Sequence, residues 1–196
     1  MVLLLVALPS IELELKQLGT SQGRKAAAKD ISGAKSLFLY NSASESAARD
    51  LAWVSFASLR NSNTSSILVV WRGNVEIARG AFATEVMLET DDRSAALKHF
   101  QECMDEGLQK ASFTEGLSAT GMYMPNRQAM RDVGIADLSC VADGMQSALL
   151  LPLTGDVNDG SFMLVLSEFE RALGPRDQAW LRSVRNKARD TCQRRA

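Results

Sequence analysis

The chain has few of the residues from which catalytic and metal sites are most often built. Its 196 residues include one histidine, His99, and three cysteines, Cys103, Cys140 and Cys192. The cysteines lie far apart and form no Cys-x-x-Cys pair, so neither a disulfide framework nor a zinc knuckle is predicted, and a reducing compartment fits best. We therefore predict that the protein is not an enzyme and that it has no metal site and no evident resident cofactor.

A strong charge of one sign and long hydrophobic runs are also missing. The formal net charge is -1, so no basic field favours nucleic acid. The apolar run 2–8 ends at Pro9, whereas a helix that crosses a bilayer needs about 20 residues. We interpret residues 1–10 as a buried strand, a disordered start or the remnant of a membrane helix. With 46% apolar and 23% charged residues, residues 11–193 are predicted to form one globular domain.

Patterns in the first half of the chain predict a strand, a linker and a helix. Residues 11–16 alternate between apolar and charged side chains, as in a strand with one buried face. The polar, glycine-punctuated segment 19–35 is typical of a linker. Ser42 and Glu45 have capping-box spacing, and apolar residues recur at helical intervals after them, so residues 42–60 are predicted to form an amphipathic helix.

A hairpin follows this helix. The apolar run 67–71 and the alternating residues 75–79 flank Gly73 and Asn74, which we interpret as the two-residue turn. Residues 82–89 are a further candidate strand. Apolar residues on one face then predict a helix over residues 92–111.

The last part of the chain is predicted to contain three short strands and a helix. The strands are Met122–Met124, followed by helical turns, and the segments 147–153 and 162–166, which form an antiparallel pair. Pro175 opens the final helix, and Trp180, Val184 and Ala188 are expected on its buried stripe. Helices around a central antiparallel sheet define the fold class as α+β.

His99 and Cys103 are four residues apart on one predicted helix, a spacing that could hold a metal or a haem iron. The apolar stripe of that helix lies on the opposite side, so we expect both side chains to face solvent or a partner. Adjacent carboxylates such as Asp91 and Asp92 point in different directions and are interpreted as solvated charges.

The final helix is rich in arginine. Arg182, Arg185 and Arg189 lie toward its C-terminal end, where the helix dipole favours cations. One interpretation is helix capping and solubility, and the other is docking to anionic lipid headgroups or to an acidic partner. Together with an exposed aromatic edge at Trp71, these arginines form the predicted partner surface.

Two sets of segments resemble known families. Ser147-Ala-Leu-Leu-Leu-Pro-Leu, Phe162-Met-Leu-Val-Leu-Ser and Gly174-Pro-Arg-Asp-Gln-Ala-Trp resemble the closing strands and helix of GAF-type domains. The segment from Asp50-Leu-Ala-Trp to Asn63, the strand Ile67-Leu-Val-Val-Trp-Arg-Gly and the later Asp-Gln-Ala-Trp resemble the CCB family for cofactor assembly of complex C, found in plastids and cyanobacteria. This resemblance covers residues 11–188, and the family shares a GAF-like soluble domain.

The resemblance implies a factor that assists covalent attachment of the extra haem to cytochrome b6 during assembly of the cytochrome b6f complex. Haem is then a substrate that the protein handles, and the implied partners are a paralogous assembly subunit and apo-cytochrome b6. The implied location is the stromal side of the plastid thylakoid membrane, or its cytoplasmic side in a cyanobacterium, with contact to the membrane surface. The alternative is a GAF-type module that senses a small molecule, with residues 121–144 as a pocket lid.

Overall fold

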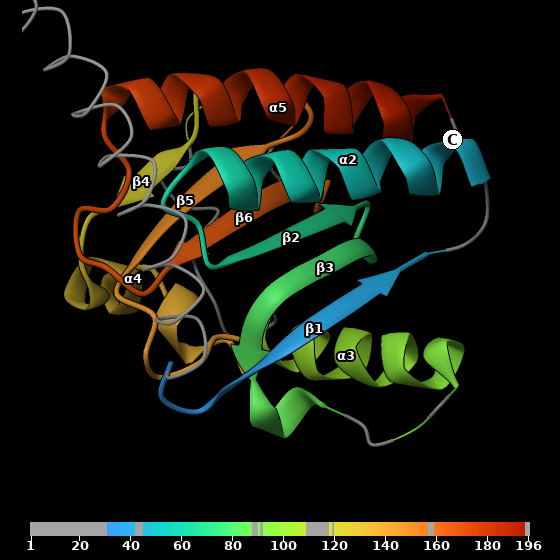
Figure 1. Cartoon of the computed structure of the whole chain (residues 1–196), viewed down its shortest axis with the longest axis horizontal. Coiled ribbons are helices and arrows are strands. Elements are labelled where there is room, and N and C mark those ends of the chain that lie inside the picture. The colour runs from blue at the N-terminus through green and yellow to red at the C-terminus, as the bar shows by residue number, and fades with distance from the viewer. Residues whose placement is uncertain are drawn as a thin grey trace, which may run out of the picture.

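The computed structural model describes residues 31–41, 45–87, 90, 92–108, 118, 120–156 and 159–194. The predicted strand at residues 11–16, the segment 1–10 and the capping serine Ser42 lie outside these ranges. The described chain forms a six-stranded antiparallel sheet with helices on both faces (Figure 1). This arrangement confirms the α+β class, whereas the likeness to GAF domains stays a prediction.

The strand order of the sheet is β1-β3-β2-β6-β5-β4. Central strands β2, β5 and β6 read as nearly continuous apolar runs because helices cover both of their faces. The predicted antiparallel pair is confirmed as β5 and β6, which are joined in register from Ser147↔Ser167 to Pro152↔Phe162. The strands are β1 (Ala34–Tyr40), β2 (Ser66–Trp71), β3 (Asn74–Ala83), β4 (Met122–Met124), β5 (Ser147–Pro152) and β6 (Phe162–Ser167).

The predicted hairpin is confirmed as β2 and β3, but its turn lies one residue earlier than predicted. Trp71 pairs with Asn74, so the two central residues are Arg72 and Gly73, with φ angles of 49° and 77°. Positive φ at both positions is the requirement of the tight turn that matches strand twist. Glycine meets this requirement without strain, and the sequence pattern alone did not fix which two residues would turn.

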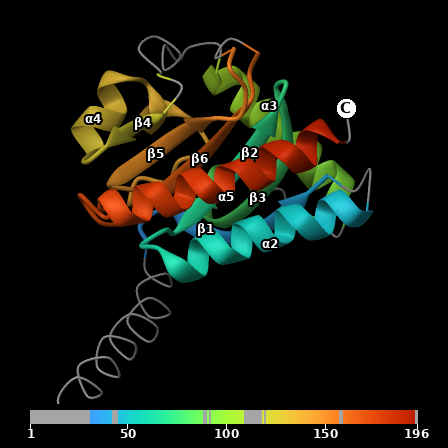
Figure 2. The ribbon, with the colours of Figure 1, turned by 90° about the horizontal axis from the view of Figure 1, so that it is seen from above.

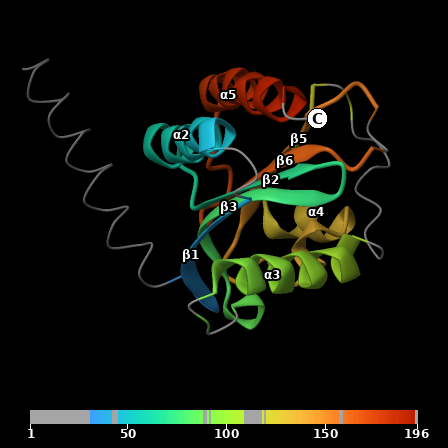
Figure 3. The ribbon, with the colours of Figure 1, turned by 90° about the vertical axis from the view of Figure 1, so that its right-hand side faces the viewer.

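Helices α2 (Glu45–Asn61) and α5 (Pro175–Gln193) cover one face of the sheet, and α3 (Arg93–Leu108) and α4 (Arg127–Asp132) cover the other (Figure 3). Short 3-10 turns at Thr84–Val86 and Ile135–Asp137 complete the fold. Two hydrophobic clusters result, one on each side of the sheet. Within the described residues, no helix combines the length and apolar character that crossing a bilayer requires.

Three sequence predictions need correction. The end of the predicted linker, Ala34 and Lys35, belongs to edge strand β1. Both faces of this strand carry apolar residues, so its sequence does not alternate cleanly between apolar and polar side chains. The described part of the candidate strand 82–89, residues 82–87, does not form a separate strand, because β3 continues to Ala83 and a 3-10 turn follows. Trp180 is not on the buried stripe of α5: its side chain is 36% exposed, whereas Val184 and Ala188 are buried as predicted.

Candidate functional site

A groove runs between α2 and α5 on the outer side of the helical layer. The two helices lie side by side and antiparallel (Figure 2), as contacts at both ends of the pair show. At one end, Asn63, just beyond α2, donates to the Ala172 carbonyl, and at the other, Arg194 at the end of α5 binds Asp50. The groove encloses about 420 Å³. Its lining residues are Asp50, Trp53, Trp180, Ser183, Val184 and Lys187.

The walls of the groove are two exposed tryptophans. Trp53 of α2 is 51% exposed and Trp180 of α5 is 36% exposed, while Val184 beneath them is buried. Most large apolar side chains on α2 and α5 pack against the sheet. Trp53 and Trp180 point away from it instead, so a role in the core does not account for them. An apolar, partly enclosed surface of this kind is typical of a site that binds another molecule.

One end of the groove is closed by an ion-pair network around Asp50. Its carboxylate lies 3.0 Å from Lys187 Nζ and 2.9 Å from Arg194 Nη2, and it accepts a hydrogen bond from Thr191 Oγ1 at 3.3 Å. The hydrogen bond from Lys187 is the main cause that holds the pKa of Asp50 below its ordinary value, with a further contribution from Arg194. This network ties the start of α2 to the end of α5.

Asp50→Asn should lower the free energy of unfolding by about 0.5 kcal/mol at neutral pH, within the range of partly exposed ion pairs. Since the folded-state pKa lies below the unfolded one, the stabilisation is present above pH of about 4 and is lost as the pH falls through the folded-state pKa. Urea denaturation of both proteins from about pH 7 to 3 measures this. Glu45→Gln, which removes the solvent-exposed Glu45–Arg49 pair, is the control and should change stability less. A wild-type advantage that persists unchanged in acid contradicts the assignment.

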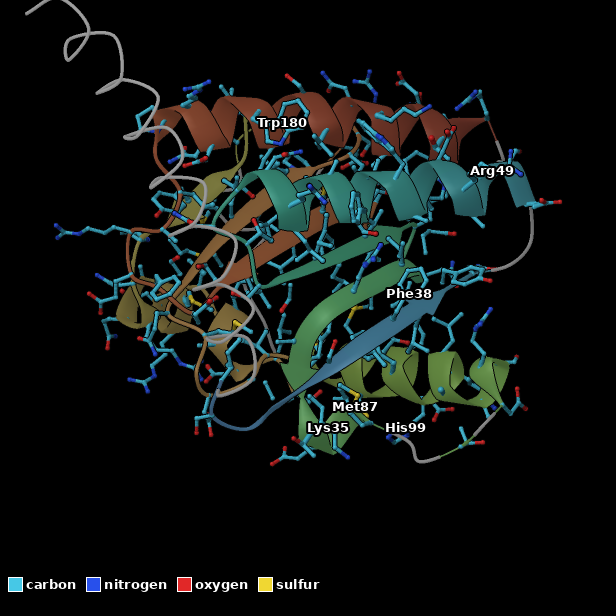
Figure 4. All side chains as sticks on the ribbon, viewed as in Figure 1. Lys35, Phe38, Arg49, Met87, His99 and Trp180 are labelled. Carbon is cyan, nitrogen blue, oxygen red and sulfur yellow. The ribbon has the colours of Figure 1, made fainter. Side chains whose placement is uncertain are left out.

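Aromatic side chains continue from the groove toward the edge of the sheet. Phe56 of α2 and Phe38 of β1 are 46% and 43% exposed, and the Arg79 guanidinium lies 5.6 Å and 4.9 Å from their ring centroids. Figure 4 shows Trp180 on α5 and Phe38 on β1, with α2 between them. We call Phe38, Trp53, Phe56 and Trp180 the aromatic surface.

The structure does not bring the four predicted partner residues together. Trp71 is 8% exposed and packs in the cluster beneath α2 and α5, so the predicted exposed aromatic edge is wrong. Trp71 belongs to the central strand β2, which lies between β3 and β6. Helices α2 and α5 cover the face of the sheet on which its side chain packs. The three arginines lie on α5 away from the groove.

Each of these arginines has a neighbour within the fold. Arg182 Nε donates to the Thr120 carbonyl at 2.9 Å, Arg185 Nη1 donates to the Pro152 carbonyl at 2.7 Å, and Arg189 pairs with the adjacent Asp190. Burial, and then the nearby charges of Arg189 and Arg182, lower the pKa of Arg185. The bonds of Arg182 and Arg185 hold α5 against the chain beside β4 and β5, whereas the Arg189–Asp190 pair lies within α5 itself.

His99 and Cys103 lie on α3, on the other side of the sheet from the aromatic surface (Figure 4). Their Nε2 and Sγ atoms are 3.7 Å apart. Both side chains are half-buried, and Cys103 packs against the core, so neither faces solvent fully. The other form of the prediction, that they face a partner, stays a prediction. Among the described residues, no three histidine, cysteine or carboxylate side chains gather as a metal site.

Two further features bear on nucleophilic chemistry. Burial raises the pKa of the Cys140 thiol to about 12, so this sulfur is a poor nucleophile at neutral pH. A Gly-x-Ser-x-Gly spacing, which serine hydrolases use in a strand-to-helix turn, occurs at residues 19–23. Its presence corrects the interpretation that the chain has no such motif, and the segment lies outside the described residues.

The fold and the groove define a small α+β domain with a surface suited to binding. The family model for cofactor assembly of complex C, CCB2/CCB4, matches residues 2–188. The chain therefore belongs to this family, as the resemblance in sequence implied. No curated protein and no solved structure matches the chain in the corresponding comparisons.

Proposed function

We propose that the protein is an assembly factor for the cytochrome b6f complex that assists covalent attachment of the extra haem to cytochrome b6. It acts by binding, together with a paralogous subunit and apo-cytochrome b6, at the stromal side of the thylakoid membrane or at its cytoplasmic side in a cyanobacterium. Haem is the substrate it helps to place. Membership of a cofactor-assembly family supports the general role.

The observation that carries the proposal is the aromatic surface on α2, α5 and β1. It holds four of the five large apolar side chains that are exposed among the described residues. Exposed tryptophans are typical of protein interfaces, where they supply much of the binding energy. A factor that works by holding two partners near each other needs such a surface.

The packing of residues 121–144 gives no specific support to the alternative of a small-molecule sensor. This segment, the predicted pocket lid, contributes Met130, Ile135 and Leu138 to the core, where each is at most 2% exposed. Arg127 also holds it in place by donating to the Ala142 and Met145 carbonyls at 2.9 and 3.0 Å.

Deletion of the gene for this chain in its photosynthetic host should abolish the haem that stays attached to cytochrome b6 in denaturing electrophoresis. Haem staining of the gel measures this, and the wild-type gene should restore the signal. The His99→Ala variant should also restore it, because the proposal gives His99 no role as a haem ligand. Cytochrome b6 that keeps its covalent haem without the chain would overturn the proposed function.

A further inference from the structure

We propose that the free edge of strand β1 binds an extended segment of a partner protein by strand addition, with carboxylates at alternate positions of that segment and apolar side chains between them. The inference rests on the proposed function, because it gives the assembly factor a place at which to hold a polypeptide partner. It goes beyond that function by defining a sequence pattern that the bound segment must carry.

Strand β1 has a partner on one side only. It pairs with β3 along its whole length, and none of the described strands pairs with its other edge (Figure 3). The outward N–H and C=O groups of an edge strand can pair with a further strand, and several peptide-binding domains use this mode. Residues 36–40 carry neither a charge nor a proline, the features that commonly protect an edge from such pairing.

Two arginines lie over the aromatic side chains of this strand. The guanidinium carbon of Arg79 is 4.9 Å from the centroid of the Phe38 ring, and that of Arg93 is 4.6 Å from the centroid of the Tyr40 ring. Phe38 and Tyr40 are two residues apart, so they lie on the same face of the strand. The edge therefore presents two cations at the spacing of alternate residues.

Both guanidinium groups are held in place by the fold. Arg79 Nη1 lies 3.5 Å from the Ala52 carbonyl, and Arg93 donates to the Tyr40 hydroxyl. Within the described residues, no carboxylate is in ion-pair distance of either arginine. Asp92, the neighbour of Arg93, instead accepts from a backbone N–H in the first turn of α3. Carboxylates from a ligand would meet two cations that are already positioned.

The two faces of β1 differ, and this difference sets the pattern of the bound segment. Leu37 and Leu39 lie on the face opposite the rings, in the hydrophobic cluster to which α3 contributes. Directly opposite residues of paired strands have Cβ atoms about 4.5–5.5 Å apart. An added strand would place side chains beside the leucines on one face and beside the ring–arginine pairs on the other. Apolar residues suit the first face, and carboxylates suit the second.

Two other occupants fit this edge less well. A second copy of the chain, paired edge to edge through β1, would bring the arginines of one edge near those of the other, and like charges across paired strands are destabilising. An anionic membrane would satisfy the cations, but it offers no ladder of N–H and C=O groups for the outward backbone of β1.

Calorimetry with synthetic peptides tests the inference. The probe is a peptide of about nine residues in which glutamate and valine alternate, to match the length of an edge strand. One control peptide has the same residues in two blocks, and another carries lysine in place of glutamate. The alternating glutamate peptide should bind, and each control should bind about tenfold more weakly or not at all. Binding should also slow amide hydrogen exchange in β1.

Variants localise the binding. Arg79→Gln and Arg93→Gln should each weaken binding of the alternating glutamate peptide about tenfold, the loss expected when a hydrogen bond to a charged group is removed. Arg131→Gln is the matched control, because it removes an exposed arginine of α4, beside β4 at the opposite edge of the sheet. It should leave the affinity unchanged.

A charge reversal separates recognition from loss of fold. The Arg79→Glu, Arg93→Glu double variant should bind the lysine peptide more tightly than the glutamate peptide, whereas a disrupted edge would bind neither. Circular dichroism checks that each variant is folded.

The inference is overturned if the block peptide binds as tightly as the alternating one, if no peptide binds, or if binding leaves the exchange of β1 unchanged. Binding of anionic lipid vesicles in place of the peptides would overturn it, and so would a concentration-dependent dimer in sedimentation that Phe38→Ala abolishes. Peptide binding that appears only in a Glu12→Lys, Glu14→Lys double variant would assign the edge to residues 11–16 of this chain, which also alternate, and would exclude the partner.

The proposed function fails separately. If haem attachment requires the chain, no peptide binds and the Arg79→Gln, Arg93→Gln double variant restores attachment fully, the edge inference is wrong and the assembly role stands. If the alternating peptide binds as described but cytochrome b6 keeps its covalent haem without the chain, the edge inference stands and the assembly role is wrong.

Discussion

Gly80→Ala should lower the free energy of unfolding by about 4 kcal/mol, the largest single effect expected outside the core. Gly80 lies in the middle of β3, opposite Leu37 of β1 and Ser66 of β2. Its φ angle is +113°, and an added Cβ would lie 2.1 Å from the Ser65 carbonyl oxygen and 2.7 Å from Ser66 Cα. Both contacts are with backbone, so relief requires the β2–β3 pairing itself to move.

Urea denaturation followed by circular dichroism measures this loss. Gly155→Ala is the control, since its φ is not in the left-handed region and nothing lies within 4 Å of the added Cβ, and it should change stability by less than about 0.5 kcal/mol. If Gly80→Ala is too unstable to purify, its yield in the soluble fraction relative to Gly155→Ala gives the same ranking. Equal stability of the two variants would contradict the close approach of β2 at Gly80.

Phe100→Ala should cost about 3–5 kcal/mol, because it removes a fully buried ring and leaves a cavity. Phe100 anchors α3 to the sheet: its ring meets Phe82 of β3 edge to face, with centroids 5.3 Å apart. This edge-to-face geometry stabilises the fold beyond what the buried apolar area contributes, since the positive edge of one ring faces the negative face of the other.

Lys98→Ala on the same helix provides the comparison, because that side chain is 80% exposed and its only described ion pair is the exposed one with Glu102. It should change the unfolding free energy by less than about 0.5 kcal/mol. Thermal and urea unfolding of the two variants measure the difference. A loss of under about 1 kcal/mol in Phe100→Ala would show that α3 does not depend on this contact.

Elements with a strong local pattern were predicted correctly from the sequence. Helix α5 begins at Pro175 as predicted, with the Asp177 carboxylate accepting from the Gly174 N–H at 3.1 Å. The three-residue strand Met122–Met124 also has the predicted bounds, although it lies in the stretch with the weakest pattern. Edge strand β1 was missed because it is half-exposed and defined mainly by pairing with β3, which is distant in sequence.

Two errors in the candidate site, at Trp180 and Trp71, could have been avoided from the sequence, whereas the pairing of Trp53 with Trp180 could not have been predicted. The buried stripe of α5 runs through Leu181, Val184, Ala188 and Cys192, and this three- and four-residue spacing already places Trp180 at its margin. The apolar run of β2 was a signal that Trp71 would be buried. No local pattern could place Trp53 beside Trp180, because only the packing of α2 against α5 joins them.

The pairing of β2 with β6 has a consequence for how the chain matures. It joins Ser66 to Leu166, so the centre of the sheet closes a loop of about a hundred residues, and such distant pairings form late because loop closure costs entropy. One wall of the groove, α2, comes before β2 in the chain, and the other wall, α5, comes after β6. Only a chain that has completed folding can therefore present both tryptophans, so the proposed partner binding would exclude an incompletely folded copy without a separate quality check.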